Sequence, residues 1–306
     1  MHVAVAIVGF RNVDDIGHCL LALGLSSHAD FEVVICENGG EAAYQVLTAS
    51  APSRLPGGQR VRLIQAPGNL GFAGGVNVCL AATSDADAWW VLNPDTQPHP
   101  DALAAKVARL GAGDCDAVGC TLYRPDGRVQ SHGGRWRGWL ARAESIGIGA
   151  PLEAAVDGPA IEAMQNYLNG AAMLIGRRFI ETIGYMREDY FLYCEEVEWC
   201  LRGRKHGLRL GFAPGARVLH AQGTTTGAGE RLANRPRTAV YLGERNRMLL
   251  TRDVYPRRLA IAALAAFAQL CVRCARARAW RQWGHGVTGL CAGFMNRRGP
   301  PGWAPR

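Results

Sequence analysis

The most constraining feature of the sequence is an unbroken apolar run, Ala-Trp-Trp-Val-Leu at residues 88–92, that ends at Asn93, Pro94 and Asp95. A strand without polar alternation is usually covered on both faces, as in a parallel α/β sheet. Such sheets bind ligands in the crevice at the carboxyl ends of their strands. Asp95 is expected at that end, on a backbone restricted by Pro94. Asn-Pro-Asp is also a common turn sequence, so the tripeptide alone leaves a plain turn open.

Three apolar runs precede this one and alternate with helical patterns. Strands are predicted over residues 3–9, 31–36 and 61–65, and helices over 13–25 and 41–49. This β-α-β-α-β order predicts a parallel, right-handed half-sheet of the nucleotide-binding type. No basic-then-apolar leader precedes the first strand, which favours a cytoplasmic protein.

The second half of the chain has a weaker pattern. Strands are predicted at 117–120, 166–175, 208–212 and 217–220, and helices over 101–110 and from Glu195 onward. Residues 123–165 carry little periodicity, so they are expected to form a mobile substrate loop or variable surface.

A glycine-rich segment at residues 67–77 leads into a helix predicted from Val78 to Ala82. Glycines before a helix allow close backbone approach, and a helix N-terminus favours anions. The glycine spacing, and the position after the third strand, differ from the dinucleotide-binding fingerprint. On its own the segment leaves a plain loop open.

The densest group of acids lies at Glu195, Glu196 and Glu198, beside aromatic residues and at the start of a predicted helix. Carboxylates in this position can serve as catalytic groups. They can equally serve as ordinary charges that stabilise a helix N-terminus. Local sequence leaves both roles open.

Positive charge is concentrated near the C-terminus. Residues 231–306 contain fifteen Arg and two acids, a balance of +13, whereas the whole chain is +8 and residues 1–230 therefore carry −5. This distribution argues against a nucleic-acid groove through the main body and for a basic surface at one end. The ten cysteines lie mostly in apolar runs, as small hydrophobic residues do in a reducing compartment. Cys271 and Cys274 lack a second cysteine pair, which argues against zinc.

Residues 259–272 form an apolar stretch of fourteen residues, shorter than the ~20 needed to span a bilayer. Arg257 and Arg258 precede it, and further arginines with Trp280 and Trp283 follow. An apolar helix with such flanks fits an anchor on an anionic membrane surface. A helix packed on the core, or on a second copy in a homodimer, fits the pattern equally well.

Together these segments resemble the inverting family 2 glycosyltransferases of the bacterial rhamnosyltransferase-like group. The resemblance runs from the first strand to about Asn246. It rests on eight segments in the family's order: Phe10-Arg11-Asn12, Glu37-Asn38, Asn69 to Asn77, Asn93-Pro94-Asp95, Asn169-Gly170-Ala171, Glu195 to Arg202, His220 and Arg245-Asn246.

The resemblance implies an α/β GT-A fold, with a mostly parallel, Rossmann-like central sheet flanked by helices and a basic helical C-terminal extension. Residues 1–250 would form the glycosyltransferase domain, divided into a nucleotide-sugar half (1–100) and an acceptor and catalytic half (101–250), and residues 251–306 the extension. The implied donor is a nucleoside-diphosphate sugar, with dTDP-rhamnose as the leading candidate. The implied acceptor is a glycan or a lipid-linked oligosaccharide of a cell-surface polysaccharide, and the implied cofactor is Mg²⁺ or Mn²⁺. The enzyme would be cytoplasmic, peripheral on the inner face of the cell membrane.

The family's residue roles carry over by position. Asp95 and His220 would bind the metal, and Asn93 stands where many relatives carry the first acid of an Asp-x-Asp motif. Glu196 occupies the Asp position of the family's Glu-Asp pair and would be the base, while Glu195 would orient the acceptor. Substrate contacts are implied for Phe10, Asn12, Glu37, Asn38, Asn69, Gly71, Gly74, Asn77, Asn93, Asn169, Gly170, Ala171 and Arg245. Glu37 stands where relatives normally carry an Asp that contacts the nucleobase of the donor.

Two other functions fit parts of the pattern. A sugar-nucleotide nucleotidyltransferase would normally carry a Gly-rich, basic segment after the first strand, which residues 9–12 lack. A catalytically inactive sugar-binding or scaffold protein of the same fold is supported only by Glu196, which stands where the family carries Asp. Asp95 and His220 argue against it.

Overall fold

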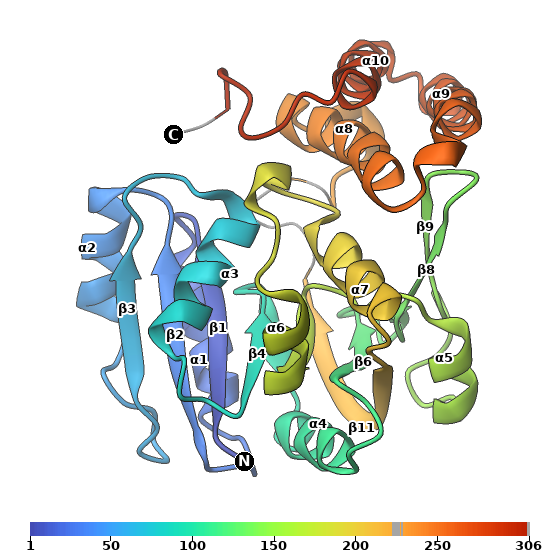
Figure 1. Cartoon of the computed structure of the whole chain (residues 1–306). Coiled ribbons are helices and arrows are strands. Elements are labelled where there is room, and N and C mark those ends of the chain that lie inside the picture. Colours follow the sequence, from blue (N-terminus) through green and yellow to red (C-terminus); the bar gives the residue numbers. More distant parts are fainter. Residues whose placement is uncertain (222–226, 228, 305–306) are drawn as a thin grey trace.

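A mixed sheet runs through the centre of the molecule, in a computed structural model that describes residues 1–221, 227 and 229–304 (Figure 1). The strands are β1 (Val3–Gly9), β2 (Phe31–Glu37), β3 (Val61–Gln65), β4 (Ala88–Leu92), β5 (Thr96–Pro98), β6 (Ala117–Tyr123), β7 (Val129–Ser131), β8 (Gly134–Arg137), β9 (Arg142–Ser145), β10 (Ala172–Gly176) and β11 (Leu210–His220). The α-helices are α1 (Val13–Leu23), α2 (Glu41–Ser50), α3 (Gly71–Ala82), α4 (Ala102–Gly111), α5 (Gly158–Met164), α6 (Arg177–Ile183), α7 (Glu195–Lys205), α8 (Arg237–Val254), α9 (Leu259–Arg276) and α10 (Trp280–Phe294).

The strand order of the sheet is β3-β2-β1-β4-β10-β6-β11-β5, with β7 paired to β6. Strands β1 to β4 are parallel, which confirms the predicted half-sheet. Strand β10 runs antiparallel between β4 and β6, and β11 is parallel to β6. Six strands (β1, β2, β3, β4, β6 and β11) thus share one direction, and their carboxyl ends lie along one edge.

Alternate residues of the central strands enter two hydrophobic layers, one on each face of the sheet. Trp89 and Val91 of β4 pack with α3 and α7 on one face, whereas Trp90 and Leu92 pack with α1 and α4 on the other. Trp90 is fully buried and lies opposite Val5 of β1 and Leu174 of β10. Covering both faces explains why this strand has no polar residue.

Three sequence-based boundaries were wrong. The strands predicted at 208–212 and 217–220 are one strand, β11 (Leu210–His220), whose register shifts between Phe212 and Arg217, because Pro214 has no backbone N–H to keep the pairing regular. Residues 123–165 are not a long loop: they contain β7, α5 and a β8–β9 hairpin. Helix α3 begins at Gly71, inside the glycine-rich segment, rather than near Val78.

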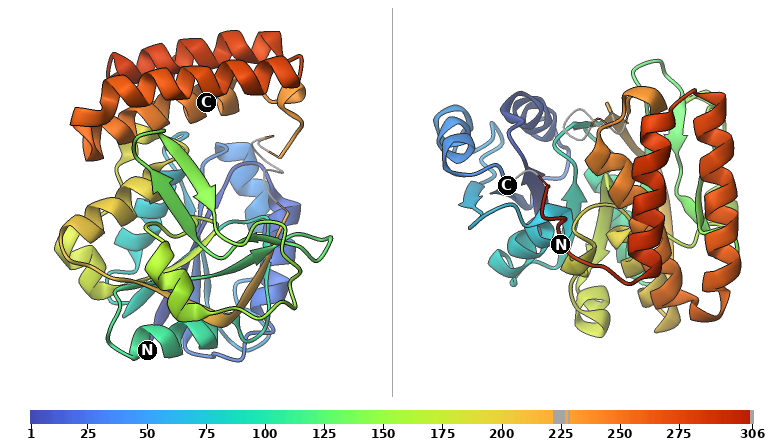
Figure 2. Two further views of the ribbon diagram at one scale, coloured as in Figure 1. Left: turned by 90° about the vertical axis from the view of Figure 1, so that its right-hand side faces the viewer. Right: turned by 90° about the horizontal axis from the view of Figure 1, so that it is seen from above.

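Helices α8, α9 and α10 pack on one another beyond the carboxyl ends of the parallel strands (Figures 1 and 2). Pro256–Arg276, which includes α9, spans 21 residues with a mean hydropathy of 1.6, and 22% of its most apolar window is buried. By length and composition alone it could cross a membrane, so the predicted length of fourteen apolar residues was too short.

Candidate active site

The predicted site begins where β1 and β2 end. Glu37 is buried, and its Oε1 accepts hydrogen bonds from the backbone N–H groups of Gly39 (2.7 Å) and Arg11 (3.1 Å). A Cβ at Gly9 would lie 2.4 Å from Glu37 Oε2. The glycine therefore makes room for the extra methylene that Glu37 has over Asp. Asn12 Oδ1 accepts from Phe10 N at 2.9 Å and shapes the adjoining turn.

Hydrogen bonds with Asn38 and Asn69 hold the glycine-rich segment in place at Gly71. Asn38 Nδ2 donates to Gly71 O at 2.8 Å, and Asn69 Oδ1 accepts from Gly71 N at 3.0 Å. Gly71 has a φ of +73°, and a Cβ there would lie 2.1 Å from Phe191 O. The next residue, Phe72, donates its N–H to the same carbonyl at 2.8 Å. Only glycine allows the start of α3 to approach the 188–194 loop this closely.

Two of the predicted substrate-contact residues in α3 hold that loop in place or accommodate it. Asn77 Nδ2 donates to Met186 O and Glu188 Oε1, both at 2.9 Å, and Asn77 Oδ1 accepts from Met186 N at 3.1 Å. Gly74 lies in the first turn of α3, where a Cβ would come within 2.7 Å of Leu70 Cβ and 3.8 Å of Glu188. The amide of Asn77 is therefore engaged within the protein, and its contact with substrate stays a prediction.

The loop that leads into α7 has a strained backbone. Phe191, Tyr193 and Cys194 have φ values of 68°, 77° and 69°, a region that non-glycine residues rarely adopt. Such residues persist only where the surroundings enforce them, and they cluster at functional sites. This loop therefore needs an external support.

Asn246 of α8 supplies the support. Its Nδ2 donates to Tyr190 O (2.9 Å), Leu192 O (2.8 Å) and Tyr193 O (2.8 Å), and its side chain is fully buried. Arg245 Nε donates to Asn246 Oδ1 at 2.8 Å, and Arg245 Nη2 donates to Tyr190 O at 2.8 Å. Sequence reasoning used Asn246 only as part of a motif and missed this role. A buried amide beside Leu249 and Leu250 was the available signal.

Glu195 and Glu196 form the first turn of α7, directly after the strained loop. Burial and the negative charge of Glu196 raise the pKa of Glu195 to about 8. Its Oε2 has no hydrogen-bond partner among the residues that the structure describes. Glu196 is half-buried, and burial raises its pKa as well, against the opposing effect of backbone N–H groups at Glu196 and Val197. Neighbouring carboxyl groups whose pKa values are both raised by burial are typical of a catalytic site.

The Asn169-Gly170-Ala171 segment joins the acid pair to the Asp95 turn. A Cβ at Gly170 would lie 3.1 Å from Glu196 Cγ, so the glycine leaves space beside the glutamate. Asn169 Oδ1 accepts from Ala171 N at 3.0 Å, and Ala171 O accepts from Asn93 N at 2.9 Å. Contacts therefore run without a break from Asn38 through the glycine segment, the 188–194 loop and the acid pair to Asn93.

Asp95 and His220 meet at the end of this series, held by the pairing of β5 with β11. His220 Nε2 lies 3.4 Å from Asp95 Oδ1, and each side chain is only 7% exposed. His220 Nδ1 lies 3.0 Å from Gln130 Oε1. Because an amide oxygen only accepts, Nδ1 is a donor to Gln130, and Nε2 is the ring nitrogen that faces Asp95.

Metal-binding histidines commonly donate one ring nitrogen to a neighbouring oxygen in this way and present the other nitrogen to the metal. Within the described part of the chain, no cluster of three or more His, Cys, Asp or Glu side chains could hold a metal ion. Asp95 and His220 thus fit an incomplete site, open to oxygen ligands from a phosphate group and water. Gln130 was missed because it lies in the segment expected to be a loop.

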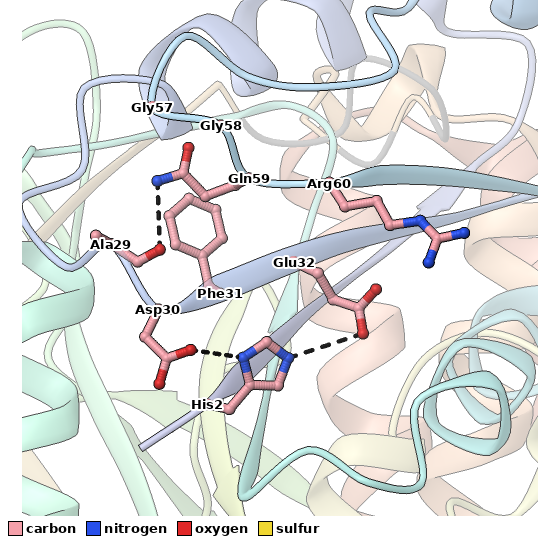
Figure 3. A pocket seen from close by; sticks show the side chains of 9 residues that line it. All are labelled: His2, Ala29, Asp30, Phe31, Glu32, Gly57, Gly58, Gln59 and Arg60. Carbon is pink, nitrogen blue, oxygen red and sulfur yellow. Dashed lines mark hydrogen bonds and ion pairs between the residues drawn. The ribbon is translucent and has the colours of Figure 1, made fainter.

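A hollow of about 410 Å³ lies at the opposite end of the sheet, beside the start of β2 (Figure 3). His2 Nδ1 lies 2.8 Å from Asp30 Oδ1, and His2 Nε2 lies 3.8 Å from Glu32 Oε1. These polar groups pair with one another at the amino ends of parallel strands. Ligands of such sheets bind at the carboxyl ends, so this hollow is not the candidate active site.

Comparisons with known proteins identify the family to which this chain is similar. A family model described as glycosyltransferase-like family 2 matches residues 2–239. The N-acetylglucosaminyl-diphospho-decaprenol L-rhamnosyltransferase of Mycobacterium tuberculosis is 27% identical, over 74% of this chain and 79% of the relative. A low-salt glycan biosynthesis hexosyltransferase of Haloferax volcanii is 23% identical, over 81% of this chain and 78% of the relative.

The fold has solved counterparts. A mannosyltransferase from Pyrobaculum calidifontis, in complex with GDP-Man and Mn²⁺, superposes with a TM-score of 0.57 at 14% identity, over 97% of this chain and 88% of that one. The predicted arrangement, a central α/β sheet flanked by helices with helices added at the C-terminus, is confirmed.

Proposed function

Because the chain belongs to the glycosyltransferase-like family 2, we propose that it catalyses inverting transfer of a sugar from a nucleoside-diphosphate donor to an acceptor hydroxyl. The observation that carries this proposal is the unbroken series of contacts from Asn38 to Asp95 and His220. It gathers an acid pair, a helix N-terminus and a carboxylate–imidazole pair at one edge of the sheet. An inverting transfer needs a base on the acceptor side and positive charge on the diphosphate side.

Glu196 is the proposed base. It is half-buried beside Gly170, and its raised pKa improves its basicity toward a hydroxyl. As the acceptor oxygen bonds to the anomeric carbon, its proton passes to Glu196. The bond from the anomeric carbon to the diphosphate breaks, and the electron pair leaves with the phosphate. Glu195, with a pKa of about 8, stays protonated at neutral pH and leaves the negative charge of the pair on Glu196.

Asp95 and His220 are the proposed holders of Mg²⁺ or Mn²⁺, which would act as a Lewis acid toward the departing diphosphate. An imidazole nitrogen beside a carboxylate oxygen suits Mn²⁺ in particular, since this ion accepts both ligand types. Helix α3 begins after the carboxyl end of β3, and the positive end of its dipole would favour the diphosphate, although the N–H groups of Gly71 and Phe72 are already engaged by Asn69 and Phe191.

The proposed donor is dTDP-rhamnose and the proposed acceptor is a lipid-linked glycan precursor. The M. tuberculosis relative, an L-rhamnosyltransferase named for a decaprenol-linked acceptor, supports both. We assign donor binding to residues 1–100 and acceptor binding to residues 101–250. Synthesis of a cell-surface polysaccharide from such precursors would place the enzyme in the cytoplasm, at the inner face of the membrane.

The decisive experiment compares Glu196→Gln with Glu195→Gln. Glu181→Gln serves as the matched control, because Glu181 is an exposed glutamate of α6. A panel of sugar nucleotides is first screened by thermal shift with Mn²⁺, since a selective ligand raises stability by mass action. The selected donor is then used in transfer assays. Glu196→Gln should lower transfer by about 10²- to 10⁴-fold and keep donor binding.

Glu195→Gln should retain more activity than Glu196→Gln, and the control should match the wild type. If Glu195→Gln is inactive while Glu196→Gln turns over normally, the base is Glu195. If the wild type binds a donor selectively but transfers nothing to any glycan or lipid-linked acceptor, the protein is an inactive sugar-binding member of its family.

A further inference from the structure

The outer face of α9 is apolar and bare. Ile261, Leu264, Phe267 and Val272 are 55%, 73%, 43% and 49% exposed. The opposite face of the helix is buried through a row of residues spaced four apart: Ala262, Ala266, Leu270 and Cys274. One side of α9 is therefore packed on the protein, while the other shows large hydrophobic side chains to the outside.

The turn of the β8–β9 hairpin extends this surface. Trp139 and Leu140 are 52% and 41% exposed. Gln269 of α9 donates to Leu140 O at 3.0 Å, and the Arg258 guanidinium lies 4.7 Å from the centre of the Trp139 ring. These contacts fix the turn beside the helix. We call Trp139, Leu140, Ile261, Leu264, Phe267 and Val272 together the apolar face.

Basic residues flank the apolar face at both ends of α9. Of the arginines in this region, Arg273 and Arg298 are paired with acids. Nine arginines and no Asp or Glu follow Asp253 in the sequence. Arg257 and Arg258 precede α9, and Arg276 and Arg278 follow at its other end. Trp280, which is 65% exposed, lies at the start of α10. Exposed tryptophans and arginines around an apolar helix are the composition of a surface that binds anionic lipid.

From these contacts and charges we infer that the apolar face docks on the surface of an anionic phospholipid membrane, with α9 parallel to the bilayer plane. A second copy of this chain fits the surface less well, because a twofold interface would bring the same arginine-rich flanks together. Insertion of α9 across the bilayer would break the packing of its buried residues against the rest of the protein. Docking on the surface keeps that packing and covers only the bare side.

This placement also orients the proposed active site. Helices α9 and α10 lie side by side in the outermost layer, with α8 between them and the sheet (Figures 1 and 2). The carboxyl ends of the parallel strands point toward the same end of the molecule (Figure 1). If the proposed lipid-linked acceptor is correct, the membrane would present it at the end of the molecule where the site opens. The docking itself rests on the apolar face and needs no assumption about the substrate.

The test measures vesicle binding by the full-length protein, without a transfer reaction. Sedimentation compares phosphatidylcholine vesicles with vesicles that contain phosphatidylglycerol, at low and high salt. The informative variant is Leu264→Glu, and Leu21→Glu is its control, since Leu21 is 71% exposed on α1 at a distant surface. Dibrominated lipids, which quench tryptophan at shallow depth, report contact with Trp139 and Trp280. Circular dichroism checks that each variant is folded.

The wild type and Leu21→Glu should bind the anionic vesicles and be released by salt. Leu264→Glu should bind at least tenfold more weakly, and Arg276→Gln about fivefold more weakly. Trp139→Phe with Trp280→Phe should remove most of the quenching. Absence of binding to anionic vesicles, or equal binding by Leu264→Glu, would overturn the inference. So would a wild-type dimer that Leu264→Glu converts to a monomer, because the apolar face would then be an interface between copies.

Discussion

Replacing Asn246 tests whether a residue remote from the reacting atoms positions the proposed base. Asn246→Asp keeps the shape of the side chain but puts an oxygen where Nδ2 now faces three carbonyl oxygens. The two N–H groups of the amide serve these three carbonyls; losing them at about 1 kcal/mol each, and leaving a buried acceptor unsatisfied at about 1 kcal/mol more, predicts a destabilisation of about 3 kcal/mol. In a chain of 306 residues that corresponds to a fall in Tm of about 5 °C, measurable by differential scanning calorimetry.

The larger effect is expected on catalysis. Without the amide, the strained residues Phe191, Tyr193 and Cys194 can relax, since each costs on the order of 1–3 kcal/mol to hold. Relaxation would displace the first turn of α7 and with it Glu196. A displacement of about 1 Å costs about 10² in rate, so kcat should fall about 100-fold. The KM for donor should change much less.

The matched control is Asn234→Asp, which adds the same charge at an exposed asparagine. It should leave both Tm and kcat unchanged. The reasoning is refuted if Asn246→Asp keeps the wild-type Tm and kcat. A fall in Tm with unchanged kcat would make Asn246 a purely structural residue.

Three further predictions concern the acid pair and the metal-binding side. The raised pKa of Glu195 makes the folded protein hold a proton that the unfolded chain releases, so the stability of the fold should decline as pH rises from about 5 to 8. Glu195→Gln should flatten this decline when Tm is measured against pH. An identical pH slope in the variant would contradict the prediction. Asp95→Ala should abolish the dependence of donor binding on Mn²⁺, measured by calorimetry, and full wild-type activity in excess chelator would refute the role of the metal. Gly170→Ala places a Cβ 3.1 Å from Glu196 Cγ. It should lower the rate of transfer about tenfold and leave donor affinity unchanged. Normal turnover would show that catalysis does not depend on the space beside Glu196.

The parallel half of the fold could be predicted because its signals are local. Unbroken apolar runs such as residues 88–92 identify strands that are buried on both faces, and the helices between them fix the topology. The positions of Asp95 and the Glu195–Glu196 pair followed from motifs at the ends of these elements. Their spatial closeness through Ala171 and Gly170 depends on the antiparallel insertion of β10. No local pattern encodes that pairing.

The parts that sequence could not supply depend on long-range contacts. Gln130 acts on His220 across 90 positions of sequence, and it belongs to a segment without helical or strand periodicity. Asn246 acts on a loop more than 50 positions earlier. The bare side of α9 could be recognised only once the small residues on its other side were seen packed. Composition alone left membrane, core and partner equally open.

The contacts of residues 298–299 have a consequence for how the enzyme is made. Arg298 Nη1 lies 3.0 Å from both Asp189 Oδ2 and Asp253 Oδ2, and Gly299 N donates to Asp189 O at 2.7 Å. The loop that precedes the acid pair is thus completed by residues that lie more than 100 positions later in the sequence. Domains usually begin to fold from the N-terminus during synthesis. A nascent chain can therefore build its sheet early, whereas the 188–194 loop gains these contacts only after residues 298–299 have been made.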